Sequence, residues 1–337
     1  MSSLLHLGFT GDVMLGRRVD ETYRESRSPS ALWGTVAPTL RGLDGLFVNL
    51  ECCLSTRGEQ WPGRRFHFRA HPDWATDALR YATVDCCTLA NNHAMDFGPD
   101  ALEETLEALS GADIATVGAG RSTADAREPA AVDCRGLTVA VIGFTDNVPA
   151  YGATADRAGT AHVEFDPKDD HSISVLAEAV ERATELDPDL LVASLHWGPN
   201  NRTEPPERHR QVARILAEWG VDFIHGHSAH VFQGIEILTP KRRDSPTVVC
   251  YDMGDFVDDY AVDPVGRNDR SFLFELVVAA DGTLVELICH PTEIESQSVY
   301  HAGKRAAGWC RKTMQERSAV FGTEFDSNGT PLTVSLV

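Results

Sequence analysis

The chain repeats one pattern, in which a short apolar run of strand length ends on polar residues and a helical segment follows. The clearest case is Val84–Leu89, which leads into the polar stretch Ala90–Gly98 and then into Pro99–Leu109, where apolar residues recur at helical spacing. The continuous apolar runs Leu137–Gly143 and Asp189–Leu195 are typical of strands buried on both faces. This alternation predicts a layered α/β fold.

Further elements follow from the same reasoning. We expect strands at residues 4–10, 46–50, 114–117, 221–225 and 247–251, and helices at residues 73–81, 172–186, 205–219 and 301–317. Ser271–Ala279 and Thr283–His290 are joined by the turn Ala280–Gly282, which predicts a C-terminal antiparallel hairpin. The segment Arg57–His71 has no clear period and is expected to form a mobile loop.

Length and charge restrict the function classes. A chain of 337 residues suffices for one large domain, which we expect at 1–260, with the hairpin and helix of 261–337 packed on it. The formal charge of −20 argues against nucleic acid and anionic membrane as partners. No signal-peptide pattern or membrane-length apolar run occurs, and the eight cysteines lack C-x-x-C spacing. We therefore expect a cytoplasmic protein with buried free thiols.

Polar side chains that suit a metal site recur at the ends of the predicted strands. They are Asp12, Glu51, Asn92 with His93, His196, His227 with His230, and Asp255. Ligands of open α/β sheets bind at the carboxyl ends of strands, so we expect these side chains to converge. The mixture of imidazole and carboxylate favours a divalent transition metal such as Mn, Zn or Fe. Taken singly, such residues are also explained as helix caps or core histidines, and Asp96 is expected to stabilise a helix N-terminus.

Six stretches carry a family resemblance. They are Gly11–Arg17, Asn49–Glu51, Ala90–His93 with Asp96 and Gly98, His196–Gly198, Gly226–His230 followed by Gln233–Glu236, and Tyr251–Phe256. In order and spacing these motifs resemble the CapA/PgsA poly-γ-glutamate capsule synthesis family, a branch of the calcineurin-like metallophosphatase fold. The resemblance implies a four-layer α-β-β-α sandwich of the metallo-dependent phosphatase type. It also implies the metal ligands Asp12, Glu51, Asn92, His196, His227 and His230, with His93 as general acid.

Two departures from the phosphatase pattern bear on the chemistry. Met14 stands where the phosphatases have a ligating histidine, and Glu51 stands in place of their bridging aspartate. A thioether is a poor ligand for a hard metal, which disfavours two-metal hydrolysis. Capsule proteins of this family are typically membrane-anchored, whereas this chain shows no anchor. The resemblance extends to soluble CapA-like epimerases that invert a residue of a lasso-peptide precursor.

The first hypothesis from the sequence is therefore a peptide epimerase that inverts a Cα in a ribosomal, lasso-type precursor. Cofactor-free proton transfer needs two bases, and we expect Asp12 and His290, with His301 as the alternative to His290. None of the four lysines lies among the strand-end residues, so a pyridoxal Schiff base is not expected. Expected substrate-binding residues are Arg17, Arg65, Arg69, Trp197 and Asp255. Expected partners are the precursor peptide and a leader-peptide-binding protein.

Two alternatives remain open at this point. The first is metal-dependent hydrolysis of a phosphoester or γ-glutamyl bond at the same site, in support of capsule synthesis. The second is a non-catalytic scaffold in a capsule-type complex. Met14 weakens the first alternative, and the missing anchor argues against the second.

Overall fold

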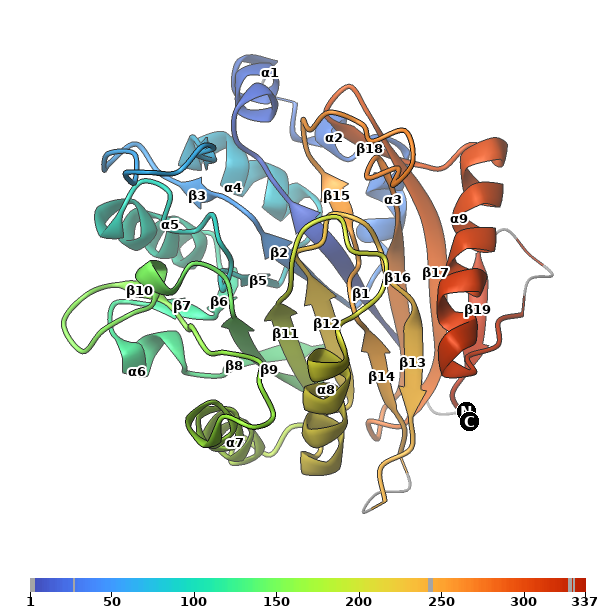
Figure 1. The fold of residues 1–337 in the computed structure, drawn as a ribbon. Coiled ribbons are helices and arrows are strands. Elements are labelled where there is room, and N and C mark those ends of the chain that lie inside the picture. Colours follow the sequence, from blue (N-terminus) through green and yellow to red (C-terminus); the bar gives the residue numbers. More distant parts are fainter. Residues whose placement is uncertain (1–3, 27, 242–244, 327–328, 330) are drawn as a thin grey trace.

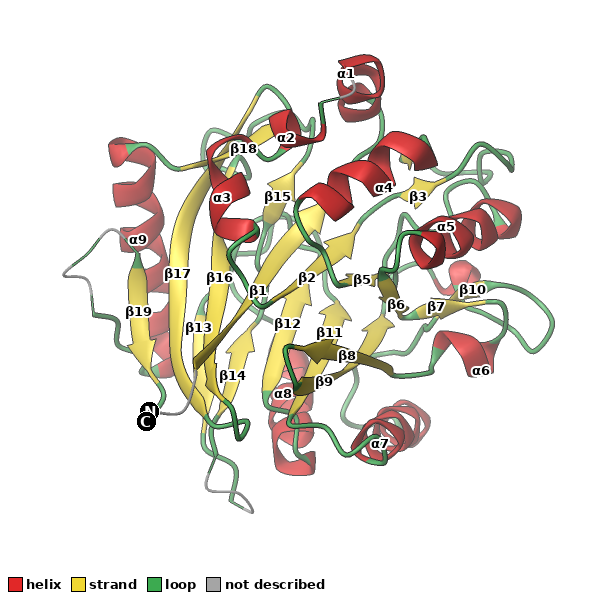
Figure 2. Ribbon diagram, turned by 180° about the vertical axis from the view of Figure 1, so that it is seen from behind, coloured by secondary structure: helices red, strands yellow, loops and turns green. Residues whose placement is uncertain are grey.

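Two β-sheets pack face to face and helices cover both outer surfaces (Figures 1 and 2). The computed structural model describes residues 4–26, 28–241, 245–326, 329 and 331–337. The arrangement is the four-layer α-β-β-α sandwich of the metallo-dependent phosphatase type, so the predicted fold class is confirmed.

The first sheet contains the N-terminal strand at its centre. Its order is β18 (Ser298–His301), β17 (Leu284–Glu295), β16 (Arg270–Ala279), β1 (Leu4–Val13), β2 (Gly45–Leu50), β5 (Cys86–Thr88) and β6 (Ala115–Val117), with β15 (Asp255–Val257) on β1 and β19 (Leu332–Ser335) on β17. Strands β2 and β15 run parallel to β1, whereas β16 is antiparallel to it. The C-terminal hairpin therefore completes this sheet beside β1.

The second sheet is mostly parallel. Its order is β13 (Ile235–Leu238), β14 (Thr247–Cys250), β12 (Phe223–His227), β11 (Leu190–His196), β9 (Leu137–Thr145) and β8 (Ala130–Cys134). Two small ladders pair β3 (Cys53–Leu54) with β4 (Arg69–Ala70) and β7 (Ala119–Gly120) with β10 (Gly159–Thr160). Because β9, β11 and β12 are parallel neighbours, their carboxyl ends lie at one edge.

The helices form the two outer layers. The first sheet is covered by α1 (Arg18–Ser26), α2 (Pro29–Leu32), α3 (Ala37–Leu40), α4 (Pro72–Tyr81) and α5 (Pro99–Gly111), and the second by α7 (Asp170–Thr184) and α8 (Glu207–Trp219). The remaining segments are α6 (Thr123–Ala126), α9 (Lys304–Ser318), η1 (Gly34–Val36), η2 (Pro149–Tyr151) and η3 (Ala319–Phe321). Helix α9 packs on β16, β17 and β13.

Side-chain alternation along the strands builds separate cores. In β9, Val139 and Val141 join the core between the sheets, whereas Ala140 and Ile142 join the core beneath α7 and α8. The apolar run Leu137–Gly143 is therefore buried on both faces, as its composition predicts. The eight cysteines, all within the described ranges, are buried and form no disulfide. No helix in the described ranges is long and apolar enough to span a membrane.

Strand β1 extends beyond its expected end at Thr10 and continues through Asp12 to Val13. Asp12 pairs in register with Asp255 of β15. A Cβ added at Gly11 would lie 1.8 Å from the carbonyl oxygen of Gly254, so only glycine permits this close approach. The glycine thereby sets the position of Asp12 against the Gly254–Asp255 turn.

Candidate metal centre

Five of the six predicted ligands converge where the ends of β1, β2, β11 and β12 meet. Asp12 lies near the end of β1 and Glu51 directly follows β2, so both belong to the first sheet. His196 and His227 end β11 and β12 of the second sheet, in register with each other. His230 lies in the loop after β12 and has a left-handed φ of +61°. Strain of this kind in a non-glycine residue is common at functional sites.

Hydrogen bonds fix the side-chain amide of Asn49, which lies between the two sheets. Oδ1 of Asn91 accepts from the backbone N–H groups of His93 (3.0 Å) and Ala94 (2.9 Å). The other end of that amide is therefore Nδ2, which donates to Oδ1 of Asn49 at 3.1 Å. Oδ1 of Asn49 is consequently an acceptor, and its Nδ2 is the donor toward the site.

The orientation of Asn49 determines the tautomer of His196. Nδ2 of Asn49 donates to Oδ1 of Asp12 at 2.6 Å and lies 3.4 Å from Nδ1 of His196. On the far side of the ring, Nε2 of His196 donates to Oδ1 of Asn92 at 2.7 Å. Burial holds the pKa of His196 well below its usual value, so the ring is neutral. Nδ1 of His196 therefore carries a lone pair.

A second chain of hydrogen bonds determines the tautomer of His227. Nε2 of His225 donates to the carbonyl oxygen of Thr10 at 2.7 Å, so its Nδ1 accepts the proton of Ser194 Oγ at 3.0 Å. Ser194 has one hydroxyl proton, so its oxygen accepts from Oγ1–H of Thr88 at 2.7 Å and from Nε2–H of His227 at 3.0 Å. Burial lowers the pKa of His225 to about 4 and that of His227 well below its usual value. Nδ1 of His227 also carries a lone pair.

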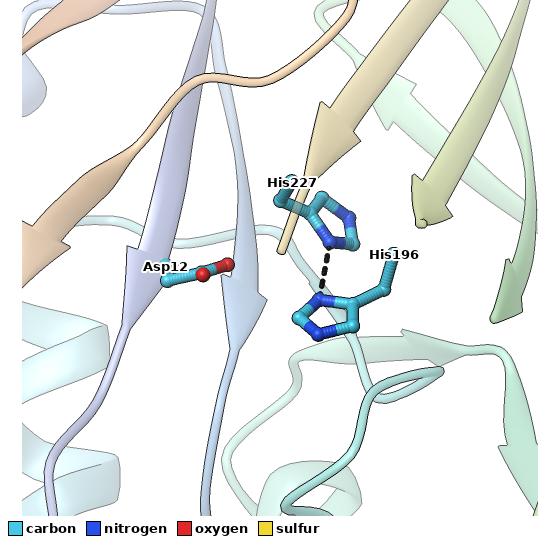
Figure 3. A group of neighbouring side chains, drawn as sticks. All are labelled: Asp12, His196 and His227. Atoms are coloured by element: carbon cyan, nitrogen blue, oxygen red, sulfur yellow. Dashed lines mark hydrogen bonds between the residues drawn. The ribbon is translucent and has the colours of Figure 1, made fainter. Parts of the chain in front are cut away.

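The two lone-pair nitrogens face each other in a first cation group. Nδ1 of His196 and Nδ1 of His227 are 2.9 Å apart, and Asp12 lies beside them (Figure 3). Neither nitrogen has a proton to donate, so the contact is unfavourable in the protein alone. A divalent cation held by both nitrogens and by a carboxylate oxygen of Asp12 would remove this repulsion. The donor set therefore fits a metal ion.

A second cation group shares Asp12 and is rich in carboxylates. Asp12, Glu51, His230 and Asp255 each place one ligand atom within 4.8 Å of the others. Nδ1 of His230 lies 2.8 Å from Oδ1 of Asp255 and 3.5 Å from Oδ2 of Asp12. Oδ2 of Asp12, Oε1 of Glu51 and Oδ2 of Asp255 are buried without a hydrogen-bond partner in the described part of the chain. Such orphaned oxygens fit a cation.

The acid groups around this centre resist ionisation. Burial raises the pKa of Asp12 to about 6, against the opposing effects of His230 and Asn49. Burial also raises the pKa of Glu51 and of Asp255 well above their usual values. Burial opposes protonation of His230, but Glu51 and Asp12 outweigh it and raise its pKa. The metal-free centre thus holds more acid groups than one imidazolium can offset, and burial favours the neutral form of these acids.

Met14, which stands where the phosphatases have a ligating histidine, led us to expect that this chain does not carry out two-metal hydrolysis. This residue is fully buried, and its Sδ accepts from the backbone N–H of Gly16 at 3.1 Å, so it lies outside both groups. Asp255, predicted to bind substrate, instead supplies a carboxylate to the second group. The buried residues therefore allow a divalent metal even without the phosphatase histidine. Asn92, predicted as a ligand, accepts the hydrogen bond that orients His196.

Asp96 orients His93 and does not cap helix α5. Gly98 occupies the N-cap position of α5, whereas Oδ2 of Asp96 lies 2.5 Å from Nδ1 of His93. Oδ1 of Asp96 accepts from the hydroxyl of Tyr151 at 2.9 Å. The expected role in stabilising a helix N-terminus is therefore wrong. The pair holds His93 with Nδ1 toward Asp96, while burial lowers the pKa of His93 against the effect of this carboxylate.

The predicted substrate arginines lie on three different segments. Arg17 directly precedes α1, Arg65 lies in the loop between β3 and β4, and Arg69 begins β4. Arg17 pairs with Asp259, and its guanidinium lies over the ring of Phe68 at 4.8 Å. Arg69 lies 3.9 Å from the ring centroid of Phe97. Arg17 and Arg69 line one cavity of about 420 Å³. Arg65 lies over the ring of Phe66, at 5.1 Å.

Trp197 belongs to a core and does not face a substrate, so its predicted role is corrected. Its side chain is only 3% exposed. The indole stacks on His209 at 4.7 Å with an interplanar angle of 6° and donates to the carbonyl oxygen of Tyr251. The tryptophan follows the last residue of β11, where the chain turns back into the layer beneath α8.

His290 lies in a different cluster from Asp12. It pairs in register with Leu273, which packs in the core between the first sheet and its helices. Its neighbour Cys289 instead joins the core between the sheets. Nε2 of His290 bonds to Oε2 of Glu275 at 2.6 Å, and Oε1 of Glu275 contacts His6. Strand alternation thus turns His290 to the helix-covered face, and the structure does not join it to Asp12 as a second base.

Four polar residues at the centre were not singled out from the sequence. Tyr260 donates to Oε2 of Glu51 at 3.0 Å, and Asp252 accepts from the backbone N–H groups of Ala229 and Gly254. Arg64 donates to the backbone carbonyl of Asn92 at 2.7 Å. Asp258 is buried, which raises its pKa to about 6. Their common signal is proximity to a motif, since three of them lie within five residues of Asp255 and Arg64 lies in the Arg57–His71 loop.

Comparison with known families agrees with this geometry. The profile of the family described as "Bacterial capsule synthesis protein PGA_cap" matches residues 6–260. The chain belongs to this family. The match runs from the start of β1 to Tyr260 and so includes every residue of both cation groups.

Individual relatives are similar over most of the chain. A "Probable polyglutamine synthesis accessory protein" of Mycobacterium tuberculosis is 30% identical over 93% of this chain and 90% of its own length. The "PGA biosynthesis protein CapA" of Bacillus subtilis is 30% identical over 76% of this chain and 64% of its own length. Among solved structures, a hypothetical protein from Thermus thermophilus has a TM-score of 0.51 at 16% identity, covering 86% of this chain and all of its own.

Proposed function

We propose that this protein is a metal-dependent hydrolase in polyglutamate synthesis that cleaves a γ-glutamyl bond of a carboxylate-rich chain. The observation that carries the proposal is the pair of buried cation groups that share Asp12. Membership in a capsule synthesis family and the names of the relatives support the substrate class. When bound, a divalent cation supplies Lewis-acid activation of the scissile group and of water.

The chain's own residues divide the remaining tasks. Asp12, Glu51, Asp255, His196, His227 and His230 hold the cations. His93, oriented by Asp96, exchanges a proton with the reacting group through Nε2, which makes no hydrogen bond with the described residues. Arg17 and Arg69, which line a cavity of about 420 Å³, bind carboxylates of the chain. Mn, Zn and Fe all suit a centre with this mixture of ligands.

Peptide Cα-epimerisation, the first hypothesis from the sequence, is the second candidate. It is favoured by Oδ2 of Asp12, a carboxylate oxygen that has no hydrogen-bond donor among the described residues. His290 bonds to Glu275 on the helix-covered face of the first sheet, so the opposite proton transfer would fall to His93. In that case the partners are a precursor peptide and a leader-peptide-binding protein. The hydrolase ranks first because it uses both cation groups.

The decisive experiment supplies poly-γ-glutamate to the purified protein loaded with Mn²⁺, Zn²⁺ or Fe²⁺ and measures chain length and released amine. We expect shorter chains, with activity lost on chelation and in the variant His227→Gln. A matched control is His209→Gln, which alters a buried histidine outside both cation groups. Absence of cleavage in every metal-loaded sample sinks the proposal.

Two further arms separate the alternatives. A generic phosphomonoester tests the other hydrolytic activity, and its chelator-sensitive cleavage in place of polyglutamate cleavage would make the bond a phosphoester. Candidate precursor peptides in D₂O test epimerisation, which adds one mass unit without cleavage. Uptake of deuterium without hydrolysis of either substrate would put the epimerase first.

A further inference from the structure

A second polar cavity lies in the segment 146–163, which follows β9. Its volume is about 290 Å³, and its polar lining residues are Thr123, Arg127, Thr154, Arg157, Thr160 and His162. The described lining contains two arginines and one histidine but no aspartate or glutamate. It shares no residue with the two cation groups. Within a chain of formal charge −20, this cavity is therefore a local concentration of cationic and donor groups.

Three of the residues that line this cavity each have a buried polar atom without a partner among the described residues. The atoms are Nε of Arg157, Oγ1 of Thr160 and Nε2 of His162. Thr160 is only 1% exposed. A buried polar atom left unsatisfied costs roughly 1–3 kcal/mol, and native structures contain few such atoms. The cluster indicates a polar ligand that accepts hydrogen bonds.

The guanidinium of Arg157 is held in place before any ligand binds. Its Nη2 donates to the backbone carbonyl oxygens of Ala150 at 3.1 Å and Gly152 at 2.6 Å. The ion pairs found among the described residues do not include Arg157 or Arg127. Both positive charges therefore remain available to an anion, and Nε of Arg157 has a fixed direction.

We propose that this cavity binds a small oxyanion, through a phosphate or a carboxylate group. A guanidinium N–H, a hydroxyl and an imidazole N–H all donate to such a group, and Arg127 adds a second positive charge. The volume lies at the lower limit of small-molecule pockets, about 300 Å³, which favours a single anion or a small acid over a polymer segment.

The site lies close to the His93 pair but is separate from it. Ala150 and Gly152, whose carbonyls Arg157 holds, flank Tyr151 in sequence. The hydroxyl of Tyr151 donates to Asp96, the partner of His93. The anion therefore binds to a segment that also supports the catalytic pair.

Calorimetric titration of the full-length, chelator-treated protein with inorganic phosphate and with acetate tests the proposal, because chelation removes any contribution of the metal centre. The variants are Arg127→Gln and Thr160→Val, which leave the backbone bonds of Arg157 intact. The matched control is Arg121→Gln, an exposed arginine that pairs with Glu103 and Glu107 outside the cavity. We expect wild type and the control to bind equally, and both cavity variants to bind at least about tenfold more weakly.

The two anions distinguish the source of the ligand. Tighter binding of phosphate assigns a phosphate group, and equal or tighter binding of acetate assigns a carboxylate. Failure of the wild type to bind either anion overturns the proposal. Equal binding by all four proteins also overturns it, because that result means an adventitious ion only. The readout is independent of activity, so neither result bears on the proposed hydrolysis.

Discussion

His196 and His227 turn their Nδ1 atoms toward each other at 2.9 Å, although hydrogen bonds on the far side of each ring leave both nitrogens without a proton. The pair is unfavourable alone and favourable around a cation. This contact therefore lowers the stability of the metal-free protein and favours the binding of a metal ion.

Replacing His227 with Gln is expected to weaken binding of a divalent metal by about 10- to 100-fold. The stability of the chelator-treated protein is expected to fall by less than this loss of metal affinity. In wild type, metal at 100 times its Kd adds about 2.7 kcal/mol to the free energy of unfolding, whereas at the same metal concentration the variant gains only about 0.4–1.4 kcal/mol. Thermal melts with and without metal measure both effects. His209→Gln serves as control, with lower stability but an intact response to metal. Metal binding as tight as wild type in His227→Gln would contradict the assignment.

Replacing Asp255 with Asn is expected to stabilise the metal-free protein by about 1–3 kcal/mol, because the buried, partnerless Oδ2 ceases to be a potential charge. The same change abolishes binding at the carboxylate-rich group. Urea unfolding in chelator measures the stability. The exposed Asp187→Asn removes the same charge and is expected to change stability by less than about 0.5 kcal/mol. Loss of stability in chelator-treated Asp255→Asn would refute the account.

In the metal-free protein, Asp12, Asp252 and Asp258 are expected to contribute a loss of stability as pH rises from about 4 to about 7. Burial raises the pKa of Asp12 and Asp258 to about 6 and that of Asp252 to about 7, from 3.8 for an ordinary aspartate. In this window the folded chain keeps protons on these three groups that the unfolded chain has lost, so their contribution to the slope is negative. Burial lowers the pKa of His196, His225 and His227, and these histidines contribute a slope of the opposite sign. Metal displaces these protons, so its stabilising effect is expected to grow with pH. Melts of wild type and of Asp252→Asn across pH in chelator isolate the acid contribution, and an equal slope in the two proteins is the contrary result. Melts in metal check the second trend.

Replacing Asp96 with Asn is expected to lower kcat by about 10- to 100-fold, with a smaller effect on KM, because His93 loses the carboxylate that orients it. Asp96 also accepts from the backbone N–H of Phe68 and from Tyr151, so stability falls as well. Tyr151→Phe separates the two effects. It removes one hydrogen bond, worth about 1 kcal/mol, but leaves the contact of Asp96 with His93. An equal loss of kcat in both variants would mean that Asp96 is only structural.

Replacing Gly11 with Ala is expected to cost about 3 kcal/mol or to prevent folding, because its Cβ would lie 1.8 Å from the carbonyl oxygen of Gly254. Gly111→Ala, in helix α5 with nothing within 4 Å of the new Cβ, is expected to be neutral or stabilising by up to about 1 kcal/mol. Chemical denaturation of the two variants compares them directly. Equal stabilities would disprove the close approach of β1 to the turn.

The strand ends could be located from the sequence because two local signals coincide there. In β11 an apolar run stops at His196, and parallel strands bring their carboxyl ends together. The sequence was a poorer guide to which face of a strand a side chain points toward. His290 ends an apolar run just as His196 does, yet it pairs with Leu273 and faces the helices, since the register of β17 decides its direction.

Contacts between residues that are far apart in the sequence could not be predicted from the sequence pattern either. Asp96 lies a few residues before α5, which is a suitable position to stabilise the N-terminus of that helix. Only the folded structure shows that its carboxylate instead accepts a hydrogen bond from Tyr151, which is 55 residues away in sequence. Trp197 is adjacent to His196, but successive residues at a strand end point in opposite directions, so one faces the centre and the other a core. Proximity in sequence is therefore a weak guide to shared function here.

The place of β1 determines when the metal centre can form during synthesis. Asp12 lies on β1, and that strand pairs with β15 and β16, which end at residues 257 and 279. His196 and His227 come from the opposite sheet and must dock against it. Most of the chain is therefore complete before the ligands meet. The centre is thus assembled late in folding, because its side chains come from positions as far apart as Asp12 and Asp255.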